Sequence, residues 1–106
     1  MPLDRLKRKM TKEVMWLYVL TILKEKPTYA YQLKKEINEK FGWSPATITS
    51  YAVMYRLKRG GYVTTEWGDE GTHPRRKYYY ITEEGDKLLN KGEEYLKSVI
   101  RELFES

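Results

Sequence analysis

The side chains most able to do chemistry in this sequence are clustered cations. Lysine and arginine gather at Lys34-Lys35, between Arg56 and Arg59, and in the run Arg75-Arg76-Lys77. Cations on one side of a protein neutralise phosphates, which supplies affinity for nucleic acid that does not depend on base sequence. The alternative for the last run is a charged guard that keeps an edge strand from aggregating. The clusters predict a surface that binds a polyanion.

The net charge is concentrated in the first part of the chain. The 106 residues carry 20 basic and 15 acidic side chains, a net charge of +5. Residues 1–60 hold a net charge of +8, residues 61–81 are neutral, and residues 82–106 hold −3. This asymmetry indicates that the first region faces a polyanion and that the last has another role. Chance bias among solvated helix faces is the alternative.

The sequence offers little for catalysis or metal binding. It has no cysteine and one histidine, His73, which stands beside Pro74 in a loop with glycine and acidic residues. Without a second nitrogen ligand, an exposed turn residue is a better interpretation of His73 than a metal ligand or a base. The sequence shows no glycine-rich phosphate loop and no catalytic triad. We expect no enzyme activity, no metal and no cofactor.

Length and apolar content predict one small domain in the cytoplasm. With 41% hydrophobic and 14% aromatic residues, the chain is too apolar for a disordered basic tail. Its longest apolar run, Val14 to Leu23, is interrupted only by Thr21 and is shorter than the ~18 residues that a membrane span requires. A lysine-rich segment follows this run, where a signal peptide would have a small-residue cleavage site. The lack of cysteine fits a reducing compartment, and we expect no membrane contact.

Three helices are predicted in the basic region, over residues 11–26, 28–40 and 45–59. The first begins near Thr11, ends before Pro27 and is apolar on nearly all sides. The third has Ser44 as its N-cap candidate, Pro45 at its first position and two glycines at its end. Because only residues 41–44 separate the second helix from the third, the two must cross steeply, as in a helix-turn-helix.

Two short strands and a long helix follow. Residues 62–67 and 76–81 are rich in β-branched and aromatic types and flank a glycine-containing turn, which predicts a β-hairpin. Thr82, followed by Glu83 and Glu84, predicts the cap of a helix that runs to about Glu105 and carries a short heptad-like leucine stripe. Three helices followed by a hairpin are typical of a winged helix-turn-helix, whose third helix enters the DNA major groove. The predicted fold class is therefore α+β, mainly α.

Three motifs resemble those of the PadR family of transcriptional regulators. Residues 29–33 (YAYQL) are similar to the family's HGYEL segment, with Tyr29 and Ala30 in place of histidine and glycine. Residues 51–57 (YAVMYRL) and the GYV at 61–63 are similar to its YPxLxRL and GLI pattern, with Ala52 where proline is common. Residues 76–85 (RKYYYITEEG) are similar to its RKYYxLTxEG signature. The resemblance covers nearly the whole chain.

The resemblance implies a sequence-specific DNA-binding regulator, a homodimeric repressor that binds a palindromic operator. It implies a winged helix-turn-helix domain over residues 1–81, with the wing at about 61–81, and a dimerisation helix over residues 82–106 that packs with the first helix. A last helix folded back on its own domain is the alternative. The expected dimer contacts are Trp16, Val19, Leu89, Leu96, Val99, Ile100 and Leu103.

The third helix has two apolar stripes: Ile48-Ala52-Tyr55 and Met54-Leu57. The family pattern, and continuity with the following strand, favour Met54 and Leu57 as the inward pair. The N-terminal turns then present short hydroxyls and a tyrosine, without an arginine, asparagine or glutamine for a bidentate base contact. We expect specificity to depend on DNA shape, water and half-site spacing. The expected DNA contacts are Lys34, Lys35, Ser44, Thr47, Thr49, Ser50, Tyr51, Arg56, Arg75, Arg76 and Lys77.

Two other functions are alternatives. The resemblance implies that the dimer interface can hold a flat hydrophobic ligand, for which Trp16, Tyr18 and Tyr95 are the candidates; core packing is the other explanation of these aromatics. A winged helix can also serve as a protein-interaction module. Trp43 and Trp67, which lie near the DNA-binding elements in sequence, are expected to be packing residues.

Overall fold

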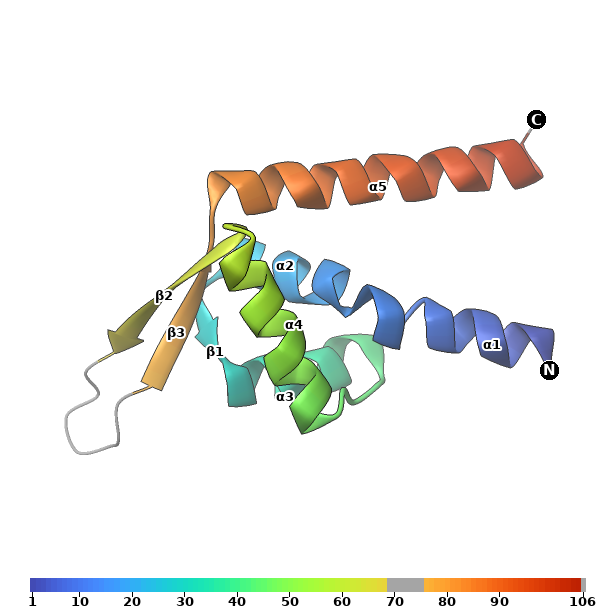
Figure 1. The fold of residues 1–106 in the computed structure, drawn as a ribbon. Coiled ribbons are helices and arrows are strands. Elements are labelled where there is room, and N and C mark those ends of the chain that lie inside the picture. Colours follow the sequence, from blue (N-terminus) through green and yellow to red (C-terminus); the bar gives the residue numbers. More distant parts are fainter. Residues whose placement is uncertain (69–75, 106) are drawn as a thin grey trace.

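Helices gather at one end of a small antiparallel sheet, and a long final helix runs over them (Figure 1). The structure is a computed structural model that describes residues 1–68 and 76–105. It has the predicted fold class, a mainly helical winged helix-turn-helix with a long C-terminal helix. In chain order the elements are α1 (Pro2–Lys9), the 3-10 helix η1 (Lys12–Val14), α2 (Met15–Glu25), β1 (Thr28–Tyr29), α3 (Ala30–Phe41), α4 (Thr47–Arg59), β2 (Val63–Gly68), β3 (Arg76–Ile81) and α5 (Glu83–Phe104).

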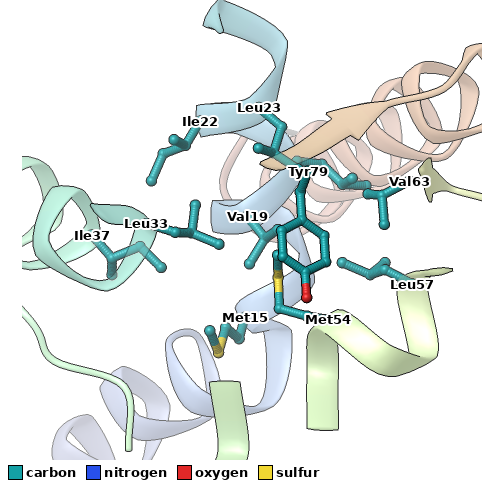
Figure 2. Packing of buried hydrophobic residues seen from close by; sticks show 11 residues of the cluster. Met15, Val19, Ile22, Leu23, Leu33, Ile37, Met54, Leu57, Val63 and Tyr79 are labelled. Carbon is teal, nitrogen blue, oxygen red and sulfur yellow. The ribbon is translucent and has the colours of Figure 1, made fainter. Parts of the chain in front are cut away.

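Helix α2 lies at the centre of the core because apolar residues cover most of its circumference. Its buried side chains are Met15, Val19, Leu20, Ile22 and Leu23. Figure 2 shows how the core is completed by Leu33 and Ile37 of α3, Met54 and Leu57 of α4, Val63 of β2 and Tyr79 of β3. Burial of Met54 and Leu57 confirms that this pair faces inward. Burying a side chain of this size contributes about 1.5–3 kcal/mol, so the core fixes which face of α4 is left for solvent.

The sheet has the order β1-β3-β2, and each pair is antiparallel. Strands β2 and β3 form the predicted hairpin. Strand β1 was not predicted, because it consists of Thr28 and Tyr29 alone and owes its conformation to pairing with Tyr79 and Tyr78 of β3. The helix expected over residues 28–40 therefore begins later, at Ala30.

Other helix boundaries also differ from the prediction. Helix α1 was not expected, and the helix expected over residues 11–26 is divided into η1 and α2. Helix α4 begins at Thr47 with Ala46 at its N-cap, and no side chain caps it. Asn38 Nδ2 of α3 donates a hydrogen bond to the Ser44 hydroxyl. The prediction of a Ser44 cap is wrong because this residue belongs to the turn and is held by α3.

Helix α5 begins as predicted and extends past the rest of the fold. The backbone N–H of Gly85 donates to Oγ1 of Thr82 at 3.0 Å, which confirms the cap. The first half of α5 lies along α2, whereas its C-terminal half and α1 project toward the same end of the molecule (Figure 1). On this projecting half, Ile100, Leu103 and Phe104 are 51%, 66% and 77% exposed. The described part of the chain therefore leaves an apolar helix end uncovered.

Candidate nucleic-acid interface

The outer face of α4 presents large side chains to solvent. A helix turns about 100° per residue, so Ile48, Tyr51 and Tyr55 lie on one face of α4. Ile48 and Tyr55 are on the side away from the buried Leu57, and Tyr51 is at the edge of this face, next to the buried Met54. These three side chains are 85%, 58% and 63% exposed. A DNA major groove is wide enough to admit an α-helix presented in this way. Tyr51 was among the expected DNA contacts. Ile48 and Tyr55 were not, although they belong to the apolar stripe Ile48-Ala52-Tyr55, which sequence reasoning placed away from the core.

The N-terminal end of α4 brings several expected contacts together. Nζ of Lys34 in α3 donates a hydrogen bond to Oγ1 of Thr47 at 2.8 Å. Together with the Asn38–Ser44 hydrogen bond, this contact ties the first turn of α4 and the preceding loop to α3. Cations and hydroxyls at a helix N-terminus suit contact with phosphate oxygens. The exposed members of this group are Lys35, Ser44, Thr47 and Thr49.

Ser50 lies off this surface, contrary to the sequence-based expectation. Its side chain is on the inner face of α4 with Met54 and Leu57, and the residue is 3% exposed. Its hydroxyl donates to the backbone carbonyl of Ala46 at 2.9 Å. A serine buried one turn before Met54 is out of reach of a base edge, so we remove it from the candidate interface.

One flank of α4 faces η1 and adds a cation that sequence reasoning missed. Thr49 and Arg56 line a groove of about 580 Å³ together with Lys12 of η1 and Trp16 of α2. Lys12 also borders a smaller pocket beside Ser44 and Thr49. The signal for Lys12 in the sequence was only the basic composition of the first segment. Glu13 is an acidic residue in the lining of the same groove, so Lys12 and Arg56 leave one net positive charge on this side of α4.

The base of the wing carries two cations on opposite faces of β3. The Arg76 guanidinium lies over the ring of Tyr29, 4.5 Å from its centroid, whereas Nζ of Lys77 lies 5.7 Å from the ring centroid of the buried Tyr79. Tyr79 packs in the core with Met54 and Leu57 of α4, so it is on the α4 side of the sheet (Figure 2). Burial, and secondly the nearby Tyr51, raise the pKa of Tyr79. Because neighbouring residues of a strand point to opposite faces, only Lys77 shares the α4 side.

Two expectations about the wing change as a result. The cations of the wing base were expected to sit on one side with those of α3 and α4, which is wrong for Arg76 because it packs over Tyr29 on the other face. Trp67 was expected to pack, but it is 62% exposed at the end of β2. Arg75 lies outside the described residues.

The family follows from comparison with known proteins. Residues 19–91 match the model of the transcriptional regulator PadR-like family. The chain belongs to the PadR family of transcriptional regulators. A transcriptional regulator from Clostridium thermocellum is 33% identical to this PadR-family chain, with a TM-score of 0.70, over 84% of this chain and 91% of that chain.

Two further solved structures are similar to this PadR-family chain. A PadR-like transcription factor from Bacteroides fragilis has a TM-score of 0.79 and 26% identity, over 94% of this chain and 96% of that chain. The structure of Bacillus subtilis PadR in complex with operator DNA has a TM-score of 0.67 and 24% identity, over 74% of this chain and 45% of that chain. At 24% identity, the similarity to Bacillus subtilis PadR shows a shared fold.

The PadR-family chain has a second distinctive surface between α2 and α5. A cavity of about 350 Å³ is open to solvent and lined mainly by apolar side chains. The lining residues include Met10, Leu17, Tyr18, Phe41, Leu96 and Ile100. The cavity is continuous with the exposed end of α5, since Ile100 belongs to both.

The expected dimer contacts of this PadR-family chain differ in how far they are buried within the protomer. Val19 is fully buried in the core of its own chain, so its expected role in a dimer is wrong. Trp16 and Leu89 are half-buried and pack against that core. Leu96 and Val99 are half-buried on α5, and Ile100 and Leu103 are exposed. Phe104 extends the exposed stripe and was missed.

The three expected ligand contacts are not brought together within one protomer. Tyr18 lines the α2–α5 cavity, where its hydroxyl donates to the carbonyl of Met10 at 2.6 Å and burial raises its pKa. Its ring packs edge-to-face on Phe41 and Trp43, with centroids 5.0 and 5.1 Å apart. Trp43 is therefore the packing residue that was predicted. Trp16 lines the other groove, and Tyr95 is exposed on α5.

Residues 1–68 and 76–105 of the PadR-family chain offer neither a metal site nor a membrane-spanning helix. No three His, Asp or Glu side chains in these ranges lie close enough to hold a metal ion. None of the helices there is both long and apolar enough to cross a bilayer. His73 lies outside the described residues.

Proposed function

We propose that this PadR-family regulator is a sequence-specific DNA-binding protein that acts as a homodimeric repressor on a palindromic operator. The observation that carries the proposal is the outer face of α4, where Ile48, Tyr51 and Tyr55 stand exposed between flanking cations. The fold that the chain shares with a PadR solved in complex with operator DNA supports DNA as the partner of this surface. As a transcriptional regulator, the protein is proposed to have no enzyme activity. We assign it to the cytoplasm.

The roles of the interface residues follow from their positions. Thr49, in the first turns of α4, is a proposed contact to a base edge or a phosphate, and Tyr51 is a proposed contact to a phosphate. Cations on both flanks are the proposed contacts to phosphates, which position a protein on DNA without reading sequence. The phosphate set consists of Lys12, Lys34, Lys35 and Arg56, with Ser44 and Thr47 beside them and Lys77 on the wing. Arg75 is included from the sequence alone.

The homodimer is proposed from the uncovered apolar surface of α5. Ile100, Leu103 and the α2–α5 cavity form one continuous apolar strip, and a second copy of α5 has the matching apolar stripe. We assign residues 1–81 to the DNA-binding domain, with the wing at about 61–81, and residues 82–106 to the dimerisation helix. A dimer of this kind presents two α4 helices to half-sites about one DNA turn apart.

The decisive experiment is selection of bound duplexes from a random DNA library with the full chain. A palindromic consensus is the expected result, and its half-site spacing reports the dimer. Affinity for the selected duplex should fall linearly with the logarithm of salt concentration, because phosphate contacts release counterions. Failure to bind any duplex at low salt would overturn the proposal and favour a winged-helix protein-interaction module.

A second candidate function is the sensing of a small aromatic ligand. The specific observation in its favour is the apolar cavity between α2 and α5, which is open and lined by the ring of Tyr18. In a dimer the exposed Tyr95 of α5 and the half-buried Trp16 could complete the walls of this site. Quenching of tryptophan fluorescence by a planar cationic drug, together with release of the selected duplex, is the expected result. Unchanged fluorescence at saturating drug would exclude this function.

A further inference from the structure

Ile48 is an aliphatic residue in the most prominent position of the candidate interface. It is the second residue of α4 and, with 85% exposure, lies on the side of the helix opposite the buried Leu57. A β-branched residue is not favoured by helix propensity, and at this exposure Ile48 buries almost nothing in its own chain. Neither helix formation nor folding therefore accounts for an isoleucine at this position, whereas contact with a partner does.

The first turns of α4 offer few hydrogen-bonding groups for base recognition. From Thr47 to Tyr55 the sequence contains no charged residue, no asparagine and no glutamine. The hydroxyl of Ser50 is buried and bonded to Ala46, and the hydroxyl of Thr47 already accepts from Lys34. Base recognition by this helix must therefore use contacts other than bidentate hydrogen bonds.

The major groove offers one strong apolar feature, the C5-methyl group of thymine, which apolar side chains contact. N-terminal residues of a recognition helix lie nearest the base edges, and Ile48 is one of them. We propose that Ile48 determines specificity by packing against a thymine C5-methyl group in each half-site. This inference rests on the proposed DNA-binding function and names the base group that α4 reads.

The test compares thymine with deoxyuridine, which lacks only the methyl group. Each thymine of the selected duplex is replaced in turn by deoxyuridine, and the dissociation constant of the full chain is measured by fluorescence anisotropy. Burial of one methyl-sized group corresponds to about a fourfold change in affinity. We expect replacement at one position to weaken binding about fourfold, and replacement in both half-sites to weaken it about 15-fold.

Ile48→Ala makes the test specific to this side chain. The substitution removes an exposed group and favours helix, so the variant should fold and bind, while its affinity no longer depends on the methyl at that position. Leu3→Ala is the matched control, since it truncates another exposed aliphatic side chain, in α1, and should keep the full deoxyuridine effect. Together these results would support the inference.

Three outcomes would overturn it in distinguishable ways. If the wild-type protein binds the duplex but no deoxyuridine replacement changes its affinity, thymine methyl groups are not read. If wild type and Ile48→Ala lose affinity equally, another residue or a change of DNA shape is responsible. If no duplex is bound by either protein, the proposed DNA-binding function itself has failed.

Discussion

Gly92 of α5 packs so closely against Trp16 of α2 that a side chain at position 92 has no free space. A Cβ atom there would lie 3.0 Å from Cη2 of Trp16 and 2.8 Å from Cδ2 of Leu17. Glycine inside a helix costs about 1 kcal/mol relative to alanine, and the close approach of the two helices offsets this cost. The contact therefore determines where α5 crosses α2 and where its apolar end projects.

Replacing Gly92 with leucine should push α5 away from α2. The larger side chain meets both Trp16 and Leu17, and overpacking of this kind costs about 1–3 kcal/mol. Urea unfolding should show a free energy of unfolding lower by that amount. Gly92→Ala is the matched control: its methyl group meets the flexible end of Leu17 at 2.8 Å and the edge of the Trp16 ring at 3.0 Å, which requires only a small shift of both side chains. Alanine also favours helix, so the stability of this variant should stay within about 1 kcal/mol of wild type. Equal stability of Gly92→Leu and wild type would contradict the packing argument.

Local sequence signals were sufficient to predict the elements whose ends or buried faces are marked by characteristic residues. Thr82 followed by two glutamates predicted the start of α5, and the hydroxyl of Thr82 does cap that helix. The alternating aromatic residues of the hairpin and the inward pair Met54 and Leu57 were also predictable, because periodicity records which face is buried. These features place α4 and the wing, and hence most of the candidate interface.

The remaining features depend on tertiary contacts that periodicity does not record. Strand β1 exists because Thr28 and Tyr29 pair with β3, which no two-residue segment could indicate. Ser44 resembles an N-cap, yet Asn38 holds it in the turn. Ser50 is a polar residue on the buried face of α4. Its burial is tolerated because its hydroxyl donates a hydrogen bond to the carbonyl of Ala46. Residue type alone therefore misplaced it on the DNA side.

A charged residue on the exposed stripe of α5 should disrupt the homodimer. Ile100→Glu places a carboxylate where two apolar surfaces are proposed to meet, and burying an unpaired charge there is strongly unfavourable. Light scattering should give the mass of a single 12.7 kDa chain instead of twice that value. Lys91→Gln changes the net charge by the same amount on the opposite face of α5 and should remain dimeric. A dimeric Ile100→Glu protein would show that this stripe is not the interface.

Loss of the Lys34 ammonium should weaken binding to all duplexes by a similar factor. Lys34 is proposed to contact a phosphate, so Lys34→Ala should reduce the slope of log affinity against log salt by about 0.9 per protomer. Lys40→Ala is the control from the same helix, since the Lys40 side chain pairs with Glu25 of α2 at 2.7 Å. That variant should keep the wild-type slope. A Lys34→Ala effect confined to the selected sequence would instead indicate a base contact.

The two cations at the base of the wing should respond differently to substitution. Lys77 shares the α4 side of the sheet, so Lys77→Ala should reduce the salt slope by about 0.9 per protomer. Arg76 lies over Tyr29 on the other face, so Arg76→Ala should leave the slope unchanged and lower the free energy of unfolding by about 0.5–1 kcal/mol. Salt titrations of DNA affinity and urea unfolding separate these effects. The reverse pattern would mean that the opposite face of the wing meets DNA.

Thr82 joins the wing to α5 through two hydrogen bonds, and its loss should loosen that junction. Its hydroxyl accepts from the N–H of Gly85 at 3.0 Å and donates to the carbonyl of Gly61 at 2.7 Å. Thr82→Ala removes both bonds, and replacing an N-cap residue by alanine costs about 0.5–2 kcal/mol. Thr82→Ser keeps the hydroxyl and should retain most of the stability. The bond to Gly61 also orients α5 relative to the start of the wing, so Thr82→Ala should raise the dimer dissociation constant as well. If Thr82→Ala kept wild-type stability and dimerisation, the backbone groups of Gly85 and Gly61 would have found other hydrogen-bond partners.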